Sequence, residues 1–297
     1  MKVAYFPGCS MHGTSREYGE SLHAVAEPLG VELDEVRDWN CCGASSAHAS
    51  SRMLAVALPA RSLALAEAQG HEQLLAPCAA CYNRLAGARH EIAEDAELAG
   101  HVKRILARPF ENRVAVLNAV EVLRDLGETI KAKATSPLKG LKVACYYGCL
   151  LVRPAAVTRF DDPEDPSSME AVVKACGAEP VAWRMRLECC GGGFSLSRKP
   201  SVVRLGRAIL EDARKAGADA IAVACPMCHS NLDFRQKAMA RDGEDKPPMP
   251  IVFITQVVGL ALGIAPEKLG MQRHFVSTKR VTSRGNGEAT APAAEVG

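Results

Sequence analysis

Ten of the twelve cysteines in this 297-residue chain fall into two sets of five that share one order. Each set has a single cysteine, then an adjacent pair, then a Cys-x-x-Cys motif, with gaps of 31 and 35 residues in the first set and 39 and 34 in the second. The sets are Cys9, Cys41, Cys42, Cys78 and Cys81, and Cys149, Cys189, Cys190, Cys225 and Cys228. Because thiols stay reduced in the cytosol, the pattern predicts metal binding or redox chemistry rather than structural disulfides.

Five thiols in a set are more than the common metal sites use. A structural zinc ion and a cubane iron–sulfur cluster each take four protein ligands. Two adjacent cysteines do not easily reach one tetrahedral ion, but they can bind different irons of a larger cluster if the backbone turns sharply. Gly43 and Gly191 to Gly193 follow the two pairs and permit such a turn. The residues therefore predict an unusual iron–sulfur cluster in each set.

The spacing and its flanks resemble the CCG motif of the B subunit of heterodisulfide reductase. The stretch "FPGC" leads into the first set and "YYGCLLVRP" into the second, and the likeness covers residues 1 to about 270. The gap before Cys225 is one residue shorter than in the motif. The resemblance implies that the ten cysteines hold two non-cubane [4Fe-4S] clusters, which face each other across a substrate cavity. It further implies homolytic cleavage of a disulfide, with each half captured at an iron and released as a thiol on protonation.

The resemblance implies the catalytic subunit of a heterodisulfide reductase-like complex, which reduces a disulfide or, in reverse, forms one. Such a protein depends on two partner subunits, one ferredoxin-like and the other a flavoprotein. It acts on a disulfide or a sulfur carrier that the sequence does not specify. One alternative is an electron-transfer subunit of another CCG complex, of the lactate- or glycerol-3-phosphate-oxidising type. Another is a zinc-stabilised interaction module.

Two histidines lie next to the cysteine sets. His12 follows Cys9 by three residues, and His229 directly follows Cys228. Imidazole titrates near physiological pH, so both histidines are candidates to donate protons to departing thiolates. The alternative is that each one packs or donates a hydrogen bond that tunes a cluster potential.

Arg153, in the stretch "CLLVRP", is a candidate to bind an anionic substrate group or a partner protein, together with Arg184 and Arg186; the alternative is that these arginines are exposed and do neither. The two cysteines outside the sets have a different expectation. Cys145 occupies the position that Tyr5 has in the first half, and Cys176 follows a helical run. We expect both to be buried thiols that bind no metal.

The elements that position the cysteines alternate between strand and helix. Short β-rich runs at 2–6 and 141–147 each end at Gly-Cys, and later strands lead into the Cys-Cys pair and the Cys-x-x-Cys motif of each half. This alternation is typical of parallel α/β units, which place sites at the carboxyl ends of their strands. We predict an α/β fold of two tandem pseudo-symmetric CCG domains, residues 1–136 and 137–276, followed by a disordered tail at 277–297.

Composition excludes several classes of function. The net charge is +2 and there is no long basic run, which argues against nucleic acid as a partner. The first residues read as a strand rather than as a secretory signal. The longest apolar stretch, "PIVFITQVVGLALGIAP", is too short and too interrupted to cross a bilayer. We therefore expect a cytoplasmic protein without a membrane span.

Overall fold

The computed structural model describes residues 1–44, 47–240 and 247–285. Its strands form two parallel four-stranded sheets with the same order of strands, β2-β1-β3-β4 and β6-β5-β7-β8. The first sheet consists of β1 (Lys2–Tyr5), β2 (Glu32–Glu35), β3 (Gln73–Leu75) and β4 (Ala115–Leu117), and the second of β5 (Lys142–Tyr146), β6 (Glu179–Pro180), β7 (Ala220–Val223) and β8 (Ile251–Phe253). The predicted α/β class and the tandem repeat of parallel units are confirmed.

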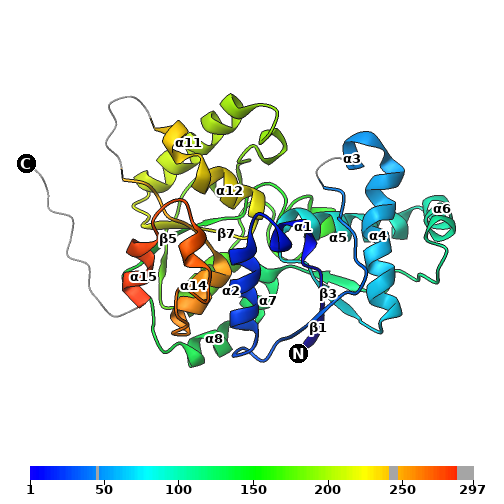
Figure 1. Ribbon diagram of the computed structural model, residues 1–297, viewed down its shortest axis with the longest axis horizontal. Helices are drawn as coiled ribbons and strands as arrows, with labels where there is room; N and C mark the ends of the chain where they lie inside the picture. Colours follow the sequence, from blue (N-terminus) through cyan, green and yellow to red (C-terminus); the bar gives the residue numbers. More distant parts are fainter. Residues whose placement is uncertain (45–46, 241–246, 286–297) are drawn as a thin grey trace, which may run out of the picture.

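Helices cover the sheets and connect their strands (Figure 1). Those of the first half are α1 (Gly8–His12), α2 (Arg16–Ala26), α3 (Ala47–Ser50), α4 (Arg52–Ala68), α5 (Ala79–Glu94), α6 (Ala96–Leu106), α7 (Ala119–Asp125) and α8 (Gly127–Lys133). Those of the second half are α9 (Ala155–Thr158), α10 (Ser168–Ala175), η1 (Met185–Leu187), η2 (Gly192–Phe194), α11 (Lys199–Lys215), α12 (Pro226–Phe234), α13 (Gln236–Met239), α14 (Ile254–Ala261), η3 (Met271–Arg273) and α15 (Lys279–Gly285).

The inner strands bring the cysteines to one edge of each sheet. Strands β5 and β7 are apolar and almost completely buried, as expected for parallel strands that are covered on both faces. Within a few residues of their carboxyl ends, β1 and β3 lead to Cys9 and Cys78, and β5 and β7 lead to Cys149 and Cys225. Two equivalent cysteine-bearing edges result.

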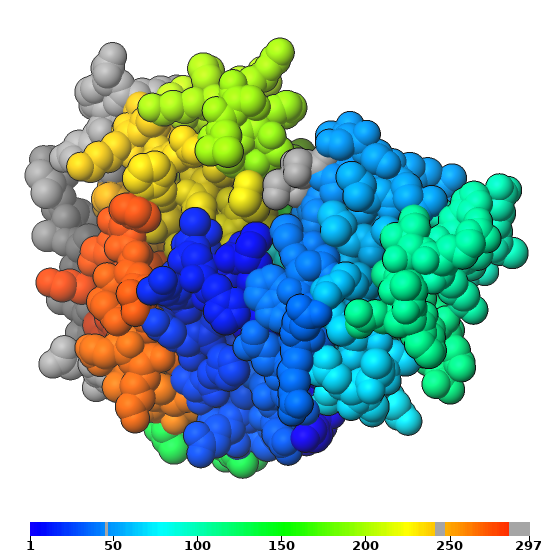
Figure 2. All heavy atoms as spheres, turned by 45° about the vertical axis from the view of Figure 1, so that its right-hand side comes forward, coloured from blue at the N-terminus to red at the C-terminus, as the bar shows by residue number. Residues whose placement is uncertain are grey.

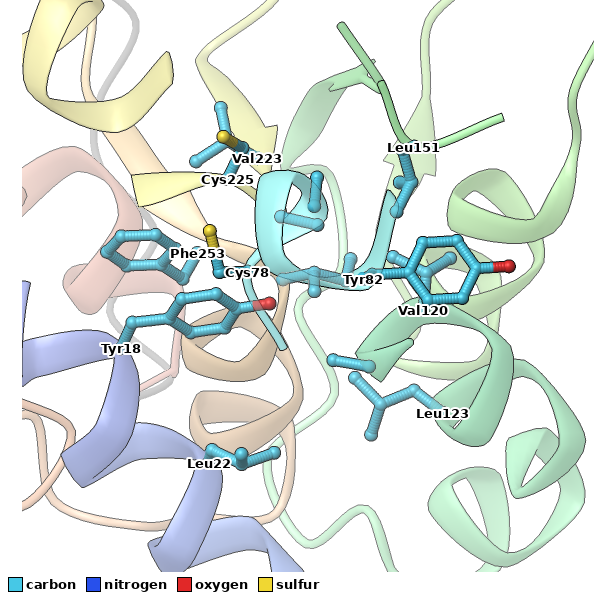
Figure 3. Close-up of a cluster of buried hydrophobic side chains, with 14 of the residues drawn as sticks. Tyr18, Leu22, Cys78, Tyr82, Val120, Leu123, Leu151, Val223, Cys225 and Phe253 are labelled. Carbon is cyan, nitrogen blue, oxygen red and sulfur yellow. The ribbon is translucent and has the colours of Figure 1, made fainter. Parts of the chain in front are cut away.

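The two halves pack through a shared core. Helices α2 and α14 lie against each other, and the hydroxyl oxygens of Ser21 and Thr255 are 2.6 Å apart in this contact. The ring of Tyr18 stacks on Phe253, with centroids 4.2 Å apart and planes at 7°. Figure 3 shows these two rings beside Cys78 and Cys225, in the buried cluster between the halves.

The apolar stretch near the C-terminus forms β8 and α14, and it is buried because α2 and α10 pack against α14. Within the described ranges, no helix combines the length and the apolar character needed to cross a membrane. Part of the segment expected to be a disordered tail is helical: α15 buries Val281 completely, a single apolar residue that gives no periodic signal. Residues 286–297 of that segment lie outside the described residues.

Candidate metal centres

The first cysteine set gathers at the carboxyl edge of the first sheet. Cys42, Cys78 and Cys81 are buried, and the sulfur atoms of Cys42 and Cys81 are 3.3 Å apart. Cys9 and Cys41 are exposed. The set therefore presents three thiols to the interior and two to the surface.

The second set repeats this arrangement. Cys190, Cys225 and Cys228 are buried, with 3.5 Å between the sulfurs of Cys190 and Cys228. Cys189 is exposed and Cys149 half-buried, and their sulfurs are 3.8 Å apart. The same division into three inner and two outer thiols thus holds in both halves.

A left-handed glycine follows each adjacent pair. Gly43 has φ +76° and Gly191 has φ +80°, a region that side chains rarely adopt. The amide of each glycine donates to the first thiol of its pair: to Cys41 Sγ at 3.5 Å and to Cys189 Sγ at 3.3 Å. The glycines therefore provide the sharp turn that lets two successive cysteines join one set.

The two sets meet at the seam between the halves. The thiols of Cys78 and Cys225 lie close enough to shift each other's pKa, that of Cys78 upward and that of Cys225 downward, and both side chains are buried. In Figure 3 they lie close together beside Tyr18 and Phe253. The two cysteine sets thus approach each other at this pair.

Hydrogen bonds between thiols stabilise thiolates inside the sets. The Cys41 thiol donates to Cys42, which lowers the pKa of Cys42. In the second half Cys149 lowers the pKa of Cys189, and Cys228 lowers the pKa of Cys225. The donor thiols Cys41, Cys149 and Cys228 have raised pKa values in turn, because each one shares its proton with a neighbouring thiol. Sulfur donors gathered this closely fit iron–sulfur ligation, because thiolates are the ligands that such clusters require.

The two candidate histidines occupy different environments. His12 is exposed, stacks on Trp39 with centroids 5.7 Å apart, and places its Nε2 3.4 Å from a carboxylate oxygen of Glu35. His229 is 4% exposed and stacks on Phe253 with centroids 4.4 Å apart. Burial lowers the pKa of His229 to about 3, so its ring is neutral at physiological pH.

His274 was not predicted from the sequence. The side-chain oxygen of Gln256 accepts a hydrogen bond from the Phe253 amide, so the side-chain nitrogen of Gln256 donates to His274 Nε2 at 2.8 Å. His274 then carries its proton on Nδ1, which donates to His229 Nε2 at 3.1 Å. No sequence signal was available, because His274 lies 45 residues from His229 and near no cysteine.

These hydrogen bonds also bear on a possible metal site. His229, Asp233 and His274 have potential ligand atoms within 4.8 Å of one another. The Nδ1 proton of His274 blocks the nitrogen that faces the other two residues, and both oxygens of Asp233 accept backbone amides. The cluster is therefore a chain of hydrogen bonds rather than a metal site.

The side chain of Arg153 is engaged within its own half. Its guanidinium donates to Glu164 at 2.7 Å, and its carbonyl accepts a 2.7 Å hydrogen bond from Asn83 of the first half. Arg186 pairs with Asp165 of the same loop. The contacts of both arginines thus hold the segment that follows Cys149.

Three other residues were singled out from the sequence, two cysteines and one arginine. Cys145 and Cys176 are completely buried, and desolvation raises the pKa of both thiols, that of Cys176 to about 12. Arg184 is exposed, and its backbone amide donates to Asp212 at 2.8 Å.

Two parallel units, each with five cysteines near the carboxyl ends of its strands, define an α/β protein with paired cysteine sets. The family model described as "CCG: Cysteine-rich domain" matches residues 3–86 and 143–233. The chain belongs to this CCG family, in the branch that resembles the B subunit of heterodisulfide reductase.

Relatives of known name support this assignment. The chain is 33% identical over 283 residues to the 8-methylmenaquinol:fumarate reductase membrane anchor subunit of Wolinella succinogenes, covering 94% of this chain and 99% of the relative. It is 29% identical to the B subunit of the ferredoxin/F(420)H(2)-dependent CoB-CoM heterodisulfide reductase of Methanosarcina acetivorans, covering 93% and 94%. It is also 29% identical to a protein of Archaeoglobus profundus that is named as similar to the heterodisulfide reductase B subunit, covering 91% and 93%.

A solved structure shares the fold. A hypothetical protein from Helicobacter pylori superimposes with a TM-score of 0.70 at 13% identity, covering 93% of this chain and 52% of the other. At that level of identity the likeness concerns the fold alone.

Proposed function

We propose that the chain is the catalytic subunit of a heterodisulfide reductase-like complex, which reduces a disulfide or, in reverse, forms one. The observation that supports this most is the contact between the two cysteine sets at Cys78 and Cys225. Reduction of a disulfide takes two electrons and yields two sulfurs, whereas iron–sulfur centres pass one electron at a time. Two adjacent centres can supply the two electrons and accept the two sulfurs.

In this proposal the ten cysteines hold two non-cubane [4Fe-4S] clusters, one in each of the domains 1–136 and 137–276. The bound clusters would supply single electrons and iron atoms that accept sulfur. The outer thiols Cys9, Cys41, Cys149 and Cys189 mark the side that faces solvent, so a disulfide or sulfur carrier approaches there. The ferredoxin-like and flavoprotein partners of the complex supply electrons in the cytoplasm.

The chain's own residues take separate parts in this proposal. His12 is exposed near Cys9 and can exchange protons with solvent, so we assign it the protonation of a departing thiolate. His229 receives a hydrogen bond from His274 on Nε2 and positions the backbone next to Cys228. Arg153 holds the segment after Cys149 through Glu164.

One observation favours a second function. The Wolinella relative is named as a membrane anchor subunit, and the match covers nearly its whole length. In this alternative the cysteine sets pass electrons within another CCG-type oxidoreductase complex, and no disulfide binds.

Anaerobic purification followed by metal analysis and electron paramagnetic resonance distinguishes these functions. We expect about eight irons and about eight sulfides per chain, and a signal of the oxidised protein that changes when a thiol is added. Iron clusters whose signal does not change with any added thiol would support the second function, in which the clusters only pass electrons. Zinc without acid-labile sulfide would contradict both redox functions and would support a zinc-stabilised interaction module.

A further inference from the structure

An apolar surface lies directly outside the second cysteine set. Five of the eight large hydrophobic side chains that are exposed in the described part of the chain gather there. We call this surface the apolar rim; its members are Phe194, Leu196, Met227, Phe234 and Phe275, with exposed fractions of 47%, 101%, 40%, 56% and 72%. Single exposed hydrophobic residues are ordinary, but a cluster of this kind marks an interaction site.

One part of the rim is built on α12. Met227 and Phe234 are seven residues apart on this helix and therefore share one face. The rings of Phe234 and Phe275 lie 4.7 Å apart. The backbone of Phe275 is fixed, because the buried carboxylate of Asp233 accepts hydrogen bonds from the amides of Phe275 and Val276 at 2.7 and 3.2 Å. The exposed aromatic pair is thus held in place rather than carried on a loose segment.

Arg235 joins this part to the rest of the rim. Its guanidinium lies 5.9 Å from the centre of the Phe234 ring and donates to the Ser195 carbonyl at 2.8 Å. Ser195 lies between Phe194 and Leu196 in the chain. In Figure 2 the segment from η2 into α11 projects at the top of the molecule, next to the yellow segment that contains α12. The rim is therefore one continuous surface.

The rim is connected to the second cysteine set. Met227 lies between Cys225 and Cys228 in the Cys-x-x-Cys motif. The side chain of Asn231 accepts a hydrogen bond from the Ser195 hydroxyl at 3.0 Å and donates toward Cys190 Sγ at 3.7 Å. A protein bound at the rim would thus lie within a few side chains of the second centre.

The charge around the rim is mostly of one sign. Residues 189–210 and 234–240, which carry Phe194, Leu196 and Phe234, contain no Asp or Glu, although the whole chain has a net charge of only +2. Their basic residues are Arg198, Lys199, Arg204, Arg207, Arg235 and Lys237. An apolar centre surrounded by positive charge is complementary to a partner with an apolar centre surrounded by carboxylates.

We propose that the apolar rim binds an acidic electron-carrier protein, which delivers electrons to the second cysteine set. The inference rests on the proposed function, because it requires a redox centre at that set. In each encounter the carrier is oxidised by one electron and the centre is reduced by one. A protein carrier is favoured over a lipid surface because the rim includes Met227, between two of the cysteines, and so lies where a carrier's own redox centre must approach.

A purified acidic ferredoxin serves as the probe for this surface. The rim variant carries Leu196→Ser, Phe234→Ser and Phe275→Ser, and the control carries Leu54→Ser and Ile105→Ser, two exposed hydrophobic residues of the first half. We expect the rim variant to bind ferredoxin at least about tenfold more weakly at low ionic strength, measured by calorimetry, and the control to bind like the unmodified chain. Reduction by methyl viologen radical, a small molecule, should be equal in all three proteins.

Charge reversal tests the basic residues around the apolar rim. We expect Arg198→Glu with Lys199→Glu to slow reduction by ferredoxin and to weaken its salt dependence, whereas Lys103→Glu with Arg104→Glu on α6 should leave both unchanged. Equal ferredoxin affinity in rim variant and control would overturn the inference. A second result would also overturn it: the unmodified chain binds phosphatidylglycerol vesicles, and the rim variant loses this binding but still binds ferredoxin. That result would identify the rim as a membrane contact.

The same measurements separate this inference from the proposed function. If methyl viologen reduces the unmodified chain but ferredoxin does not bind it, the docking inference fails and the proposed function stands. If the anaerobically purified chain contains no iron that methyl viologen can reduce, the proposed function fails and the docking inference with it.

Discussion

The two halves share a framework and differ in what surrounds it. Both have the strand order 2-1-3-4 within their own sheet, a left-handed glycine after the cysteine pair and three buried thiols. The residue after each Cys-x-x-Cys motif differs: it is Tyr82 in the first half and His229 in the second. The thiol framework is thus repeated, while the neighbours that tune it are not.

Each of these two residues contacts the opposite half. The Tyr82 hydroxyl donates to the Thr158 carbonyl at 2.7 Å, in the segment after Cys149. The ring of His229 places Nδ1 3.8 Å from a carboxylate oxygen of Glu17, in the segment after Cys9. The contacts are reciprocal in position but different in chemistry, a phenol in one case and an imidazole in the other. We therefore expect the two centres to have different reduction potentials.

The largest expected effect comes from removing one buried thiol in either half. Cys42→Ser and Cys190→Ser should each abolish one centre, so that about half of the bound iron is lost in each variant. Iron analysis of the anaerobically purified proteins measures this loss. Cys145→Ser is the control, because Cys145 is buried outside both sets, and it should keep all the iron. Complete loss of iron in either set variant would mean that the two centres cannot form independently.

The two left-handed glycines should differ in their tolerance of a side chain. Alanine at either position adopts a left-handed backbone, which costs about 1–2 kcal/mol. At Gly43 the added Cβ would also lie 2.7 Å from the Cβ of Ala47, whereas at Gly191 its nearest neighbours are 3.3 Å away. We expect Gly43→Ala to lower the free energy of unfolding by more than about 2 kcal/mol and Gly191→Ala by less. Urea unfolding of both variants would contradict this if their losses were equal.

The half-buried imidazole of His274 should make the second half sensitive to acid. Burial lowers the pKa of His274 to about 4, so between pH 6.5 and 4 the unfolded chain binds a proton that the folded chain does not. Stability therefore falls as the pH falls through this window, by about 2 kcal/mol at pH 5 for this residue. Urea unfolding at pH 7 and pH 5 should show a smaller difference for His274→Asn than for the unmodified chain. His12→Asn, which removes an exposed imidazole, is the control.

The smallest expected effects come from single hydroxyl groups at the seam. Tyr18 donates to the Pro77 carbonyl at 3.1 Å, next to Cys78, and Tyr82 donates to the Thr158 carbonyl. Tyr18→Phe and Tyr82→Phe keep the rings but leave a buried carbonyl without its donor, at a cost of about 1 kcal/mol each. Tyr18→Phe should also shift a cluster's resonance signal more than Tyr82→Phe does, because the Tyr18 hydroxyl lies beside a cysteine of the set and the Tyr82 hydroxyl points to Thr158. A signal shift in Tyr82→Phe alone would contradict this assignment.

The features that could be predicted from the sequence are those that a local residue pattern determines. Gly-Cys at the ends of the β-rich runs 2–6 and 141–147 placed cysteines at the strand ends, and the α/β class and the CCG family followed correctly. The ligand roles of the ten cysteines and the domain limits stay predictions. What the sequence did not indicate depends on contacts between distant segments: the hydrogen bond of His274 to His229, and the pairing of Arg153 with Glu164. No periodic pattern in the sequence indicates such contacts, because they form only when distant segments pack together.

The burial of Cys78 and Cys225 at the seam has a consequence for biogenesis. Both thiols are almost inaccessible once Tyr18 has stacked on Phe253 and the halves have closed. An iron–sulfur unit is larger than a water molecule and cannot pass through a close-packed core. We therefore expect cofactor insertion to precede closure, while the chain is still partly open. Maturation of this protein would then be part of its folding, and a chain that folds first without iron would be a poor acceptor afterwards.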